Sequence, residues 1–108
     1  MNKKEYILCV AIHYKDFNYF SDDVKTIPIN QYMPTNIKDG IVVIGYRHAQ
    51  CLRLLQAIIG VENLPLTNHT QGFLTSKNRF VDRKEAAKIA FENNQCKETT
   101  ILFSEDLY

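Results

Sequence analysis

The chain carries very little net charge. Its 13 lysine and arginine residues are balanced by 12 aspartates and glutamates, which leaves a formal net charge of +1. Sequence-independent binding to DNA or RNA relies on a strongly basic face, so we expect no nucleic-acid polymer as a partner. A small anion held in a local pocket remains compatible with this balance. The longest apolar run, residues 7–12, is too short to span a bilayer, and we expect no membrane partner.

Cysteine is scarce, and its spacing does not suit metal or disulfide chemistry. The three cysteines are an odd number, and no two of them form a CxxC pair. The three histidines show no ligand spacing relative to the cysteines, so we expect no zinc site and no cofactor. Cys9 and Cys51 fall in apolar patterns, which indicates buried free thiols in a reducing cytoplasm.

Recognised catalytic motifs are missing as well. The sequence has no G-x-S-x-G, no phosphate-binding loop, no H-E-x-x-H and no G-x-G-x-x-G. Glu105 and Asp106 are adjacent, and adjacent positions of an extended chain face opposite ways, which does not suit a pair of catalytic carboxylates. We therefore expect a binding protein rather than an enzyme.

What the sequence does contain is the pattern of one α+β domain, residues 1–108. Apolar runs predict buried strands at residues 6–14 and 41–45, and shorter β-prone runs predict strands at 71–76 and 99–103. We expect a short, mostly antiparallel sheet. Residues 15–39 are predicted to be irregular apart from a short strand at 25–29, and so long a loop suggests function or oligomer contacts.

Two helices are predicted. Residues 48–59 place their apolar side chains on one face of a 3.6-residue period, and Gly60 ends the pattern. These apolar positions are Cys51, Leu52, Leu55, Ile58 and Ile59. The second helix starts after Asp82, an N-cap with Glu85 three residues on, and carries a narrow apolar stripe before it ends at residues 93–94.

Arginine is rarer than lysine, with 4 residues against 9, and it is concentrated. Three of the four arginines lie in two short blocks, residues 45–48 and 78–83, close to aromatic residues. A guanidinium group binds phosphate or carboxylate through two parallel bonds and stacks on flat rings. The pattern favours recognition of an anionic, aromatic molecule such as a nucleotide. Ordinary ion pairs at helix ends are the alternative, and spacing alone leaves both open.

The two blocks suit different parts of such a molecule. Arg47 and His48 stand at a helix N-terminus, where free amide groups and the helix dipole attract anions, and where a cation needs a compensating partner. That partner is either an acidic side chain or a bound phosphate. In the second block, polar side chains could reach base edges, and Phe73 and Phe80 could stack on a base for about 1–3 kcal/mol. A place in the hydrophobic core is the alternative for both rings.

Four segments together resemble a known family. They are residues 45–48 (Gly-Tyr-Arg-His), 71–76 (Gln-Gly-Phe-Leu-Thr-Ser), 78–86 (Asn-Arg-Phe-Val-Asp-Arg-Lys-Glu-Ala) and 102–108 (Leu-Phe-Ser-Glu-Asp-Leu-Tyr). With the opening strand at 7–16, the likeness covers most of the chain. The set resembles the first family of Thoeris anti-defence proteins, which phages and prophages encode.

The resemblance implies a sponge protein in the cytoplasm of the infected bacterial host. Members of that family bind cyclic ADP-ribose isomers made by a host TIR-domain enzyme, do not cleave them, and keep the effector silent. Homo-oligomers built from dimers, up to hexamers, are implied, with further sites for cyclic oligonucleotides. The ligand-binding residues that the matching segments carry over are Arg47, His48, Phe73, Thr75, Asn78, Arg79, Phe80 and Arg83.

Two other functions stay open at this point. One is a hydrolase or phosphodiesterase that degrades a nucleotide, with His48 or Glu105 as the acid–base group. The other is an inhibitor that contacts a host protein directly through the loop at residues 15–39.

Overall fold

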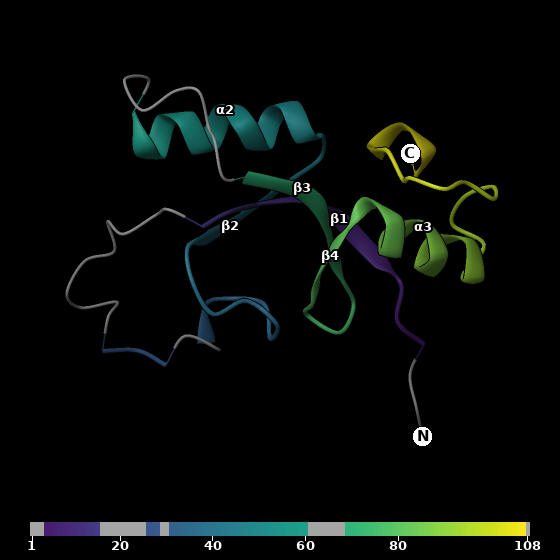
Figure 1. The fold of residues 1–108 in the computed structure, drawn as a ribbon, viewed down its shortest axis with the longest axis horizontal. Helices are drawn as coiled ribbons and strands as arrows, with labels where there is room; N and C mark the ends of the chain where they lie inside the picture. Colours follow the sequence, from purple (N-terminus) through teal and green to yellow (C-terminus); the bar gives the residue numbers. More distant parts are fainter. Residues whose placement is uncertain (1–3, 16–25, 29–30, 61–68, 108) are drawn as a thin grey trace.

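The protein is described by a computed structural model, which covers residues 4–15, 26–28, 31–60 and 69–107. Within these residues the chain forms four strands, β1 (Ile7–Tyr14), β2 (Ile41–Gly45), β3 (His69–Thr75) and β4 (Phe80–Asp82). It also forms two α-helices, α2 (His48–Ile59) and α3 (Arg83–Glu92), and the 3-10 turn η3 (Ser104–Asp106). The strands make one antiparallel sheet in the order β2-β1-β3-β4, as Figure 1 shows. The predicted α+β class is confirmed.

Most of the predicted elements are confirmed, and one strand is wrong. β1, β2, α2 and α3 lie where the sequence places them, and β3 begins two residues earlier than predicted. Residues 99–103 are not a strand. The fourth strand is Phe80–Asp82, because a tight turn at Asn78, with a φ of 57°, folds it directly back onto β3. The predicted strand at 25–29 lies partly outside the described residues, and residues 26–28 do not form one.

The helices cover one side of the sheet with a shared core. α2 packs on β1 and β2, while α3 packs mainly on β3 and β4. The side chains that alternate toward this side, such as Val10, Ile12 and Phe73, are fully buried. They meet Leu55 of α2 and the apolar stripe of α3, whose members are Ala86, Ala87, Ile89 and Ala90. Burial of this apolar surface is the main stabilising contribution to the fold.

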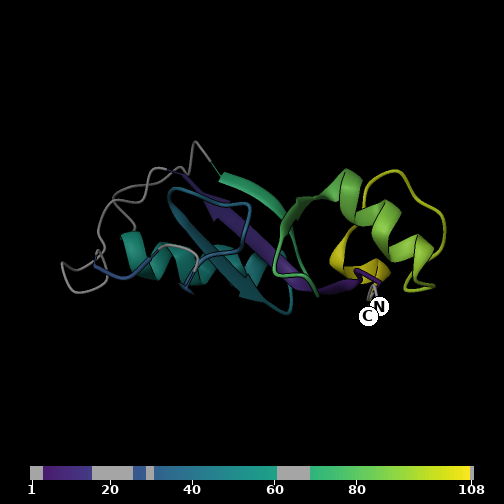
Figure 2. The same cartoon turned by 90° about the horizontal axis from the view of Figure 1, so that it is seen from below.

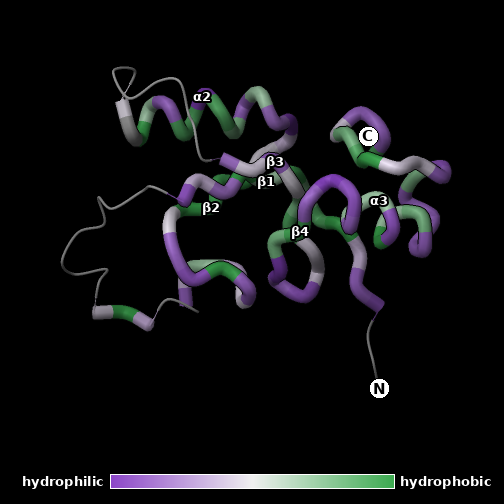
Figure 3. The backbone as a smooth tube through the Cα atoms, in the orientation of Figure 1, coloured by the Kyte–Doolittle hydropathy of each residue, from purple (hydrophilic) through white to green (hydrophobic). Residues whose placement is uncertain are grey.

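α2 is amphipathic, but its apolar face is not entirely covered. Cys51 and Leu55 are buried, whereas Leu54 is 50% exposed and Ile58, which the pattern assigned to the buried face, is 44% exposed. Figure 3 shows the alternation of hydrophobic and hydrophilic residues along this helix. None of the helices in the described part of the chain has the length and apolarity to cross a membrane.

A second, smaller apolar layer lies on the opposite side of the sheet, between the sheet and residues 31–40. These residues lie below the sheet in Figure 1. Ala11 and His13 of β1 point to this side and are buried, as are Phe80 and Met33. The Phe80 ring contacts His13 edge-on, with ring centres 5.8 Å apart. Gly72 makes this possible, since a Cβ there would lie 2.9 Å from the Phe80 ring and 2.1 Å from the Val81 carbonyl oxygen.

Residues 35 and 36 are attached to the turn between β3 and β4. The Asn36 carboxamide accepts a hydrogen bond from the Phe80 amide at 2.8 Å and donates to the Phe80 carbonyl at 2.6 Å, as a neighbouring strand would. The Thr35 amide donates to the Asn78 carbonyl at 2.8 Å. These bonds cover part of the β4 edge and fix the segment against the sheet.

The cysteines are free thiols, as predicted, but they differ in burial. Cys51 is buried, and desolvation raises its pKa to about 11. Cys9 and Cys96 are only half-buried, although burial raises the pKa of each of these thiols too. Protonated thiols of this kind are poor nucleophiles and poor metal ligands.

Candidate functional site

The two helices begin beside each other, and this brings His48 of the first arginine block next to Arg83 of the second. Arg47 is the N-cap of α2, His48 is its first residue, and Arg83 is the first residue of α3. The Nδ1 atom of His48 lies 3.4 Å from Nη2 of Arg83. Figure 2 shows the C-terminal segment passing close to α3. We call this group the helix-start cluster; it consists of Tyr46, Arg47, His48, Gln71, Arg83, Phe103 and Ser104.

The Arg83 guanidinium is partly buried, and its hydrogen-bond acceptors among the described residues are neutral. It donates to the Leu102 carbonyl at 3.2 Å and to the Gln71 side-chain oxygen. In the described part of the chain, no carboxylate oxygen lies within 4.0 Å of it. Burial lowers the pKa of Arg83, and the Glu105 carboxylate acts through space in the opposite direction. A buried positive charge that lacks an adjacent anion is costly, and a bound anion would relieve that cost.

Both ring nitrogens of His48 are engaged in the fold. Nε2 lies 2.8 Å from the Gly72 carbonyl oxygen, to which it can only donate, so the hydrogen-bond pattern assigns the proton to Nε2 and leaves Nδ1 as the acceptor from Arg83. The side chain is 8% exposed, and burial lowers its pKa. Its ring meets Phe73 edge-on, with centres 5.1 Å apart. The imidazole is therefore a neutral, fixed group beneath the arginines.

The C-terminal segment holds both arginines of the helix-start cluster. Arg47 Nη1 donates to the buried Ser104 hydroxyl at 3.0 Å. Each guanidinium also stacks on an aromatic ring, Arg47 on Tyr46 and Arg83 on Phe103, with 4.6 Å from the guanidinium carbon to the ring centre in both cases. Those two rings are 55% and 51% exposed. Charged and aromatic surfaces that suit a nucleotide therefore reach the solvent together.

Residues 102–104 of the C-terminal tail contact the arginines of the helix-start cluster. The Leu102 carbonyl, the Phe103 ring and the Ser104 hydroxyl make the contacts, while the Asp106 carboxylate accepts from the Phe103 amide at 2.9 Å. Leu107 packs against the main core.

Arg79 and Thr75 belong to a different network, at the start of β1. Arg79 binds the Glu5 carboxylate through two bonds of 2.8 and 2.7 Å and also reaches Glu85 at 3.1 Å. The Thr75 hydroxyl donates to Glu5 at 2.6 Å. Mainly because of Arg79, the pKa of Glu5 falls to about 2. The charge of Arg79 is thus compensated inside the protein, which is the ion-pair alternative that the sequence left open.

The remaining predicted residues are separated from the cluster or buried. Phe73 is fully buried and Phe80 is 8% exposed, so both rings are core residues and neither presents a stacking face to solvent. Asn78 forms the turn between β3 and β4. Of the eight predicted residues, the structure therefore brings together only Arg47, His48 and Arg83 around a surface that a ligand can reach.

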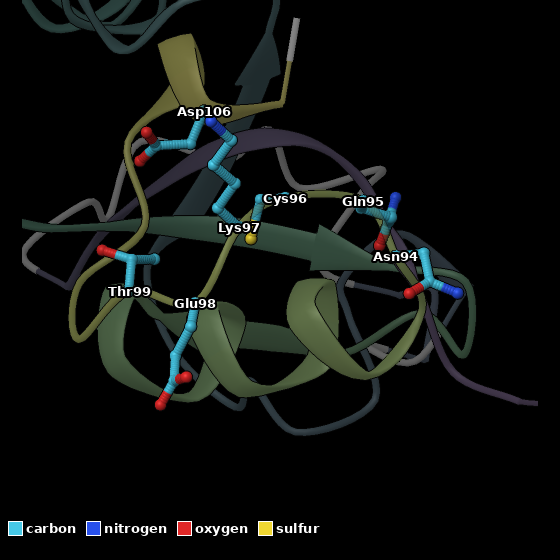
Figure 4. A pocket seen from close by; sticks show the side chains of 7 residues that line it. All are labelled: Asn94, Gln95, Cys96, Lys97, Glu98, Thr99 and Asp106. Carbon is cyan, nitrogen blue, oxygen red and sulfur yellow. The ribbon is translucent and has the colours of Figure 1, made fainter.

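The described part of the chain also forms cavities away from the helix-start cluster. One of about 580 Å³ is formed by the loop after α3 and by Asp106, as Figure 4 shows. Another of about 300 Å³ lies between residues 31–34 and the sheet, with Asn78 at its border. Neither cavity is lined by the arginines of the helix-start cluster. In the described part of the chain, no group of three His, Cys, Asp or Glu side chains could hold a metal ion.

Sequence reasoning missed several members of these groups. Gln71 and Ser104 lie inside the segments that carry the family resemblance, so that signal could have nominated them as arginine partners. Phe103 was assigned to a strand, which hid its stacking on Arg83. Glu5 had no sequence signal, because its partner Arg79 lies 74 positions away.

Comparison with known proteins places the chain among phage proteins. No curated protein and no solved structure matches it. One family model, described as Phage T4 y16D protein, matches residues 6–108, which is nearly the whole chain and includes every residue of the helix-start cluster. The chain therefore belongs to the phage T4 y16D protein family.

Proposed function

We propose that this phage protein binds an anionic nucleotide signal at the helix-start cluster and sequesters it without cleaving it. The observation that carries the proposal is the state of Arg83. Its guanidinium is partly buried, stacked on an exposed ring, and surrounded in the described chain by neutral acceptors. A phosphate group would supply the missing negative charge, and charge-assisted bonds to phosphate are among the stronger ones in proteins.

The surroundings of Arg83 support a nucleotide rather than a simple inorganic ion. Tyr46 and Phe103 are exposed aromatic rings, each paired with a guanidinium group, and such rings offer stacking surfaces for a base. The first amides of α2 add positive potential to the same region, whereas at the start of α3 the Asp82 carboxylate accepts from the Glu85 amide and offsets part of that potential. Phosphate and base can thus be recognised on one surface.

Binding without cleavage is supported by the environment of His48. A general acid or base needs a nitrogen that reaches the substrate, and both nitrogens of this imidazole are engaged with Gly72 and Arg83. Its lowered pKa keeps the ring neutral near pH 7. Glu105 is exposed, and its charge acts on both His48 and Arg83 from outside the hydrogen-bonded group.

We further propose that the ligand is a cyclic ADP-ribose isomer made by a host TIR-domain enzyme. The resemblance of the arginine-bearing segments to the first Thoeris anti-defence family supports this identification, as does the phage origin of the family that the chain matches. Sequestration would take place in the cytoplasm of the infected host and would keep the host effector inactive. A homo-oligomer is the expected form.

The test is to incubate the purified protein with the products of a TIR-domain enzyme, to denature the complex, and to analyse the released molecules by mass spectrometry. Release of intact cyclic nucleotide supports sequestration. Release of a cleaved product would show an enzyme instead, and the absence of any nucleotide would favour inhibition of a host protein by direct contact.

The variant Glu105→Gln sharpens this test. It removes a negative charge that acts on Arg83 through space, so sequestration predicts tighter nucleotide binding. If Glu105 were a catalytic acid–base group, the same variant would instead accumulate uncleaved ligand that the unaltered protein destroys. Glu98→Gln, an exposed carboxylate at the 580 Å³ cavity, is the matched control.

A further inference from the structure

We propose that the cavity between residues 31–34 and the sheet is a second binding site, specific for an uncharged planar ring of purine size. The cavity has a volume of about 300 Å³. Its floor is formed by Val42, Ile44 and Leu74, which alternate toward the side of the sheet opposite the helix core. The site is separate from the helix-start cluster and does not depend on the function proposed for it.

The walls of this cavity are fixed by bonds already present in the fold. The segment that carries Met33 is held in place by the Thr35 amide, which donates to the Asn78 carbonyl at 2.8 Å. It is held further by the paired bonds between Asn36 and Phe80. Met33 itself is 5% exposed and packs as a buried wall. A cavity whose walls are ordered before binding loses little entropy when a ligand enters.

One side of the cavity is open to solvent. Ile44 is 51% exposed and Tyr32 is 39% exposed. Both residues line the cavity and are partly exposed to solvent. A flat ligand could therefore enter between them and rest on the aliphatic floor. An exposed isoleucine on an apolar strand is unfavourable in water, and an occupant would remove that surface from solvent.

The chemistry of the lining selects the class of ligand. None of the eight residues that line the cavity is charged. A phosphate or carboxylate placed there would lose hydration without gaining an oppositely charged partner, which makes a charged ligand unfavourable. Aliphatic surface above and below suits the face of a ring, and the volume lies at the small end of ligand pockets.

Two carboxamides supply the polar contacts that a purine-type edge requires. Gln31 and Asn78 both border the cavity, and within the described chain neither side chain has a hydrogen-bond partner. A carboxamide both donates and accepts, and so pairs with a ring edge that presents one donor and one acceptor. Three features together assign the site to an uncharged ring of purine size: the aliphatic floor, the buried methionine wall and the unpaired carboxamides.

The probe for this site is adenosine, which has the ring and no phosphate. The full chain, labelled at methyl groups, is titrated with adenosine and followed by NMR. We expect saturable shifts of the Ile44, Leu74 and Met33 methyl signals. Ile44→Glu places a charge at the open side and should weaken the apparent affinity by about tenfold or more. Leu54→Glu, on an equally exposed apolar residue of α2 outside the cavity, is the matched control and should bind like the parent protein.

Two further variants complete the experiment. Asn78→Gly keeps the positive φ that glycine tolerates, so it removes the carboxamide without straining the turn, and should weaken adenosine binding. Arg83→Ala should leave adenosine binding unchanged. The proposal would be overturned if none of the three methyl signals shifts on addition of adenosine. It would also be overturned if Ile44→Glu and Leu54→Glu lose adenosine affinity equally. If the protein shows the adenosine shifts but does not bind an anionic nucleotide at Arg83, only the function proposed above is overturned.

Discussion

The first residue of α2 and the first residue of α3 are in contact, with Nδ1 of His48 3.4 Å from Nη2 of Arg83. The contact joins two arginine-bearing segments that are 35 positions apart in the chain. Because a neutral imidazole accepts the bond, it positions the guanidinium without neutralising its charge. The same charge therefore remains available to an anionic ligand.

Arg47→Ala and Arg83→Ala should each weaken binding of the anionic nucleotide far more than Lys77→Ala. Loss of one charge-assisted bond to a partly buried phosphate should cost about 1.5–3 kcal/mol. Lys77 is exposed and lies in the turn before Arg79, so it serves as the matched cation. Isothermal calorimetry on the three variants provides the measurement, and equal affinities would remove the argument from the arginines.

Arg79→Ala should have the opposite profile, with reduced stability and unchanged nucleotide affinity. Its side chain neutralises Glu5, which is only 16% exposed, and removal leaves that carboxylate without its two charge-assisted bonds. The expected loss in the free energy of unfolding is about 1–3 kcal/mol, measured by urea denaturation. A variant that is as stable as the parent but fails to bind nucleotide would place Arg79 in the binding site instead.

Stability should decline at acid pH because of Glu5. Its pKa is about 2 in the folded protein and 4.5 as the ordinary value, so the unfolded chain binds more protons between these values. The contribution of Glu5 is therefore fully present above pH 4.5 and is lost as the pH falls toward 2. Thermal melts of the parent and of Glu5→Gln check this. The variant should not show the loss of stability between pH 4.5 and pH 2. The lowered pKa of His48 destabilises the fold below pH 6.5, and this effect should be the same in both proteins.

Removal of residues 104–108 should lower nucleotide affinity and thermal stability together. The truncation deletes the Ser104 hydroxyl that binds Arg47 and the Leu107 side chain that packs on the core. Ser104→Ala separates the two effects, because it removes the hydroxyl and leaves the packing. If the truncated protein melts at the same temperature and binds nucleotide with the same affinity as the full chain, the tail is dispensable.

The protein should be at least a dimer in solution. The long loop carries four aromatic or apolar residues that an interface could cover, Tyr19, Phe20, Tyr32 and Met33. Tyr32 is 39% exposed, Met33 is buried, and Tyr19 and Phe20 lie outside the described residues. The structure supplies other exposed apolar side chains on α2, Leu54 and Ile58. Exposed apolar surface of this kind is common at interfaces. Light scattering at micromolar concentration that gives 12.5 kDa, the mass of one chain, would contradict this prediction.

Local sequence signals determined the elements that depend on neighbouring residues. The helix at His48–Ile59 follows from the 3.6-residue period and Gly60, and α3 starts where Asp82 accepts a bond from the Glu85 amide at 2.9 Å. The central strand β1 follows from its uninterrupted apolar run. These patterns act within a few residues, so they can be read directly along the chain.

Tertiary structure decided the fourth strand and the division of the predicted site. Residues 99–103 have β-propensity but no strand partner, whereas Phe80–Asp82 is short but is delivered to β3 by the turn at Asn78. The sequence also could not show that Arg79 is neutralised by Glu5 while Arg83 faces Gln71 and His48. Whether an arginine is compensated depends on side chains that are remote in sequence, and only the packing of the strands and helices brings those side chains within bonding distance.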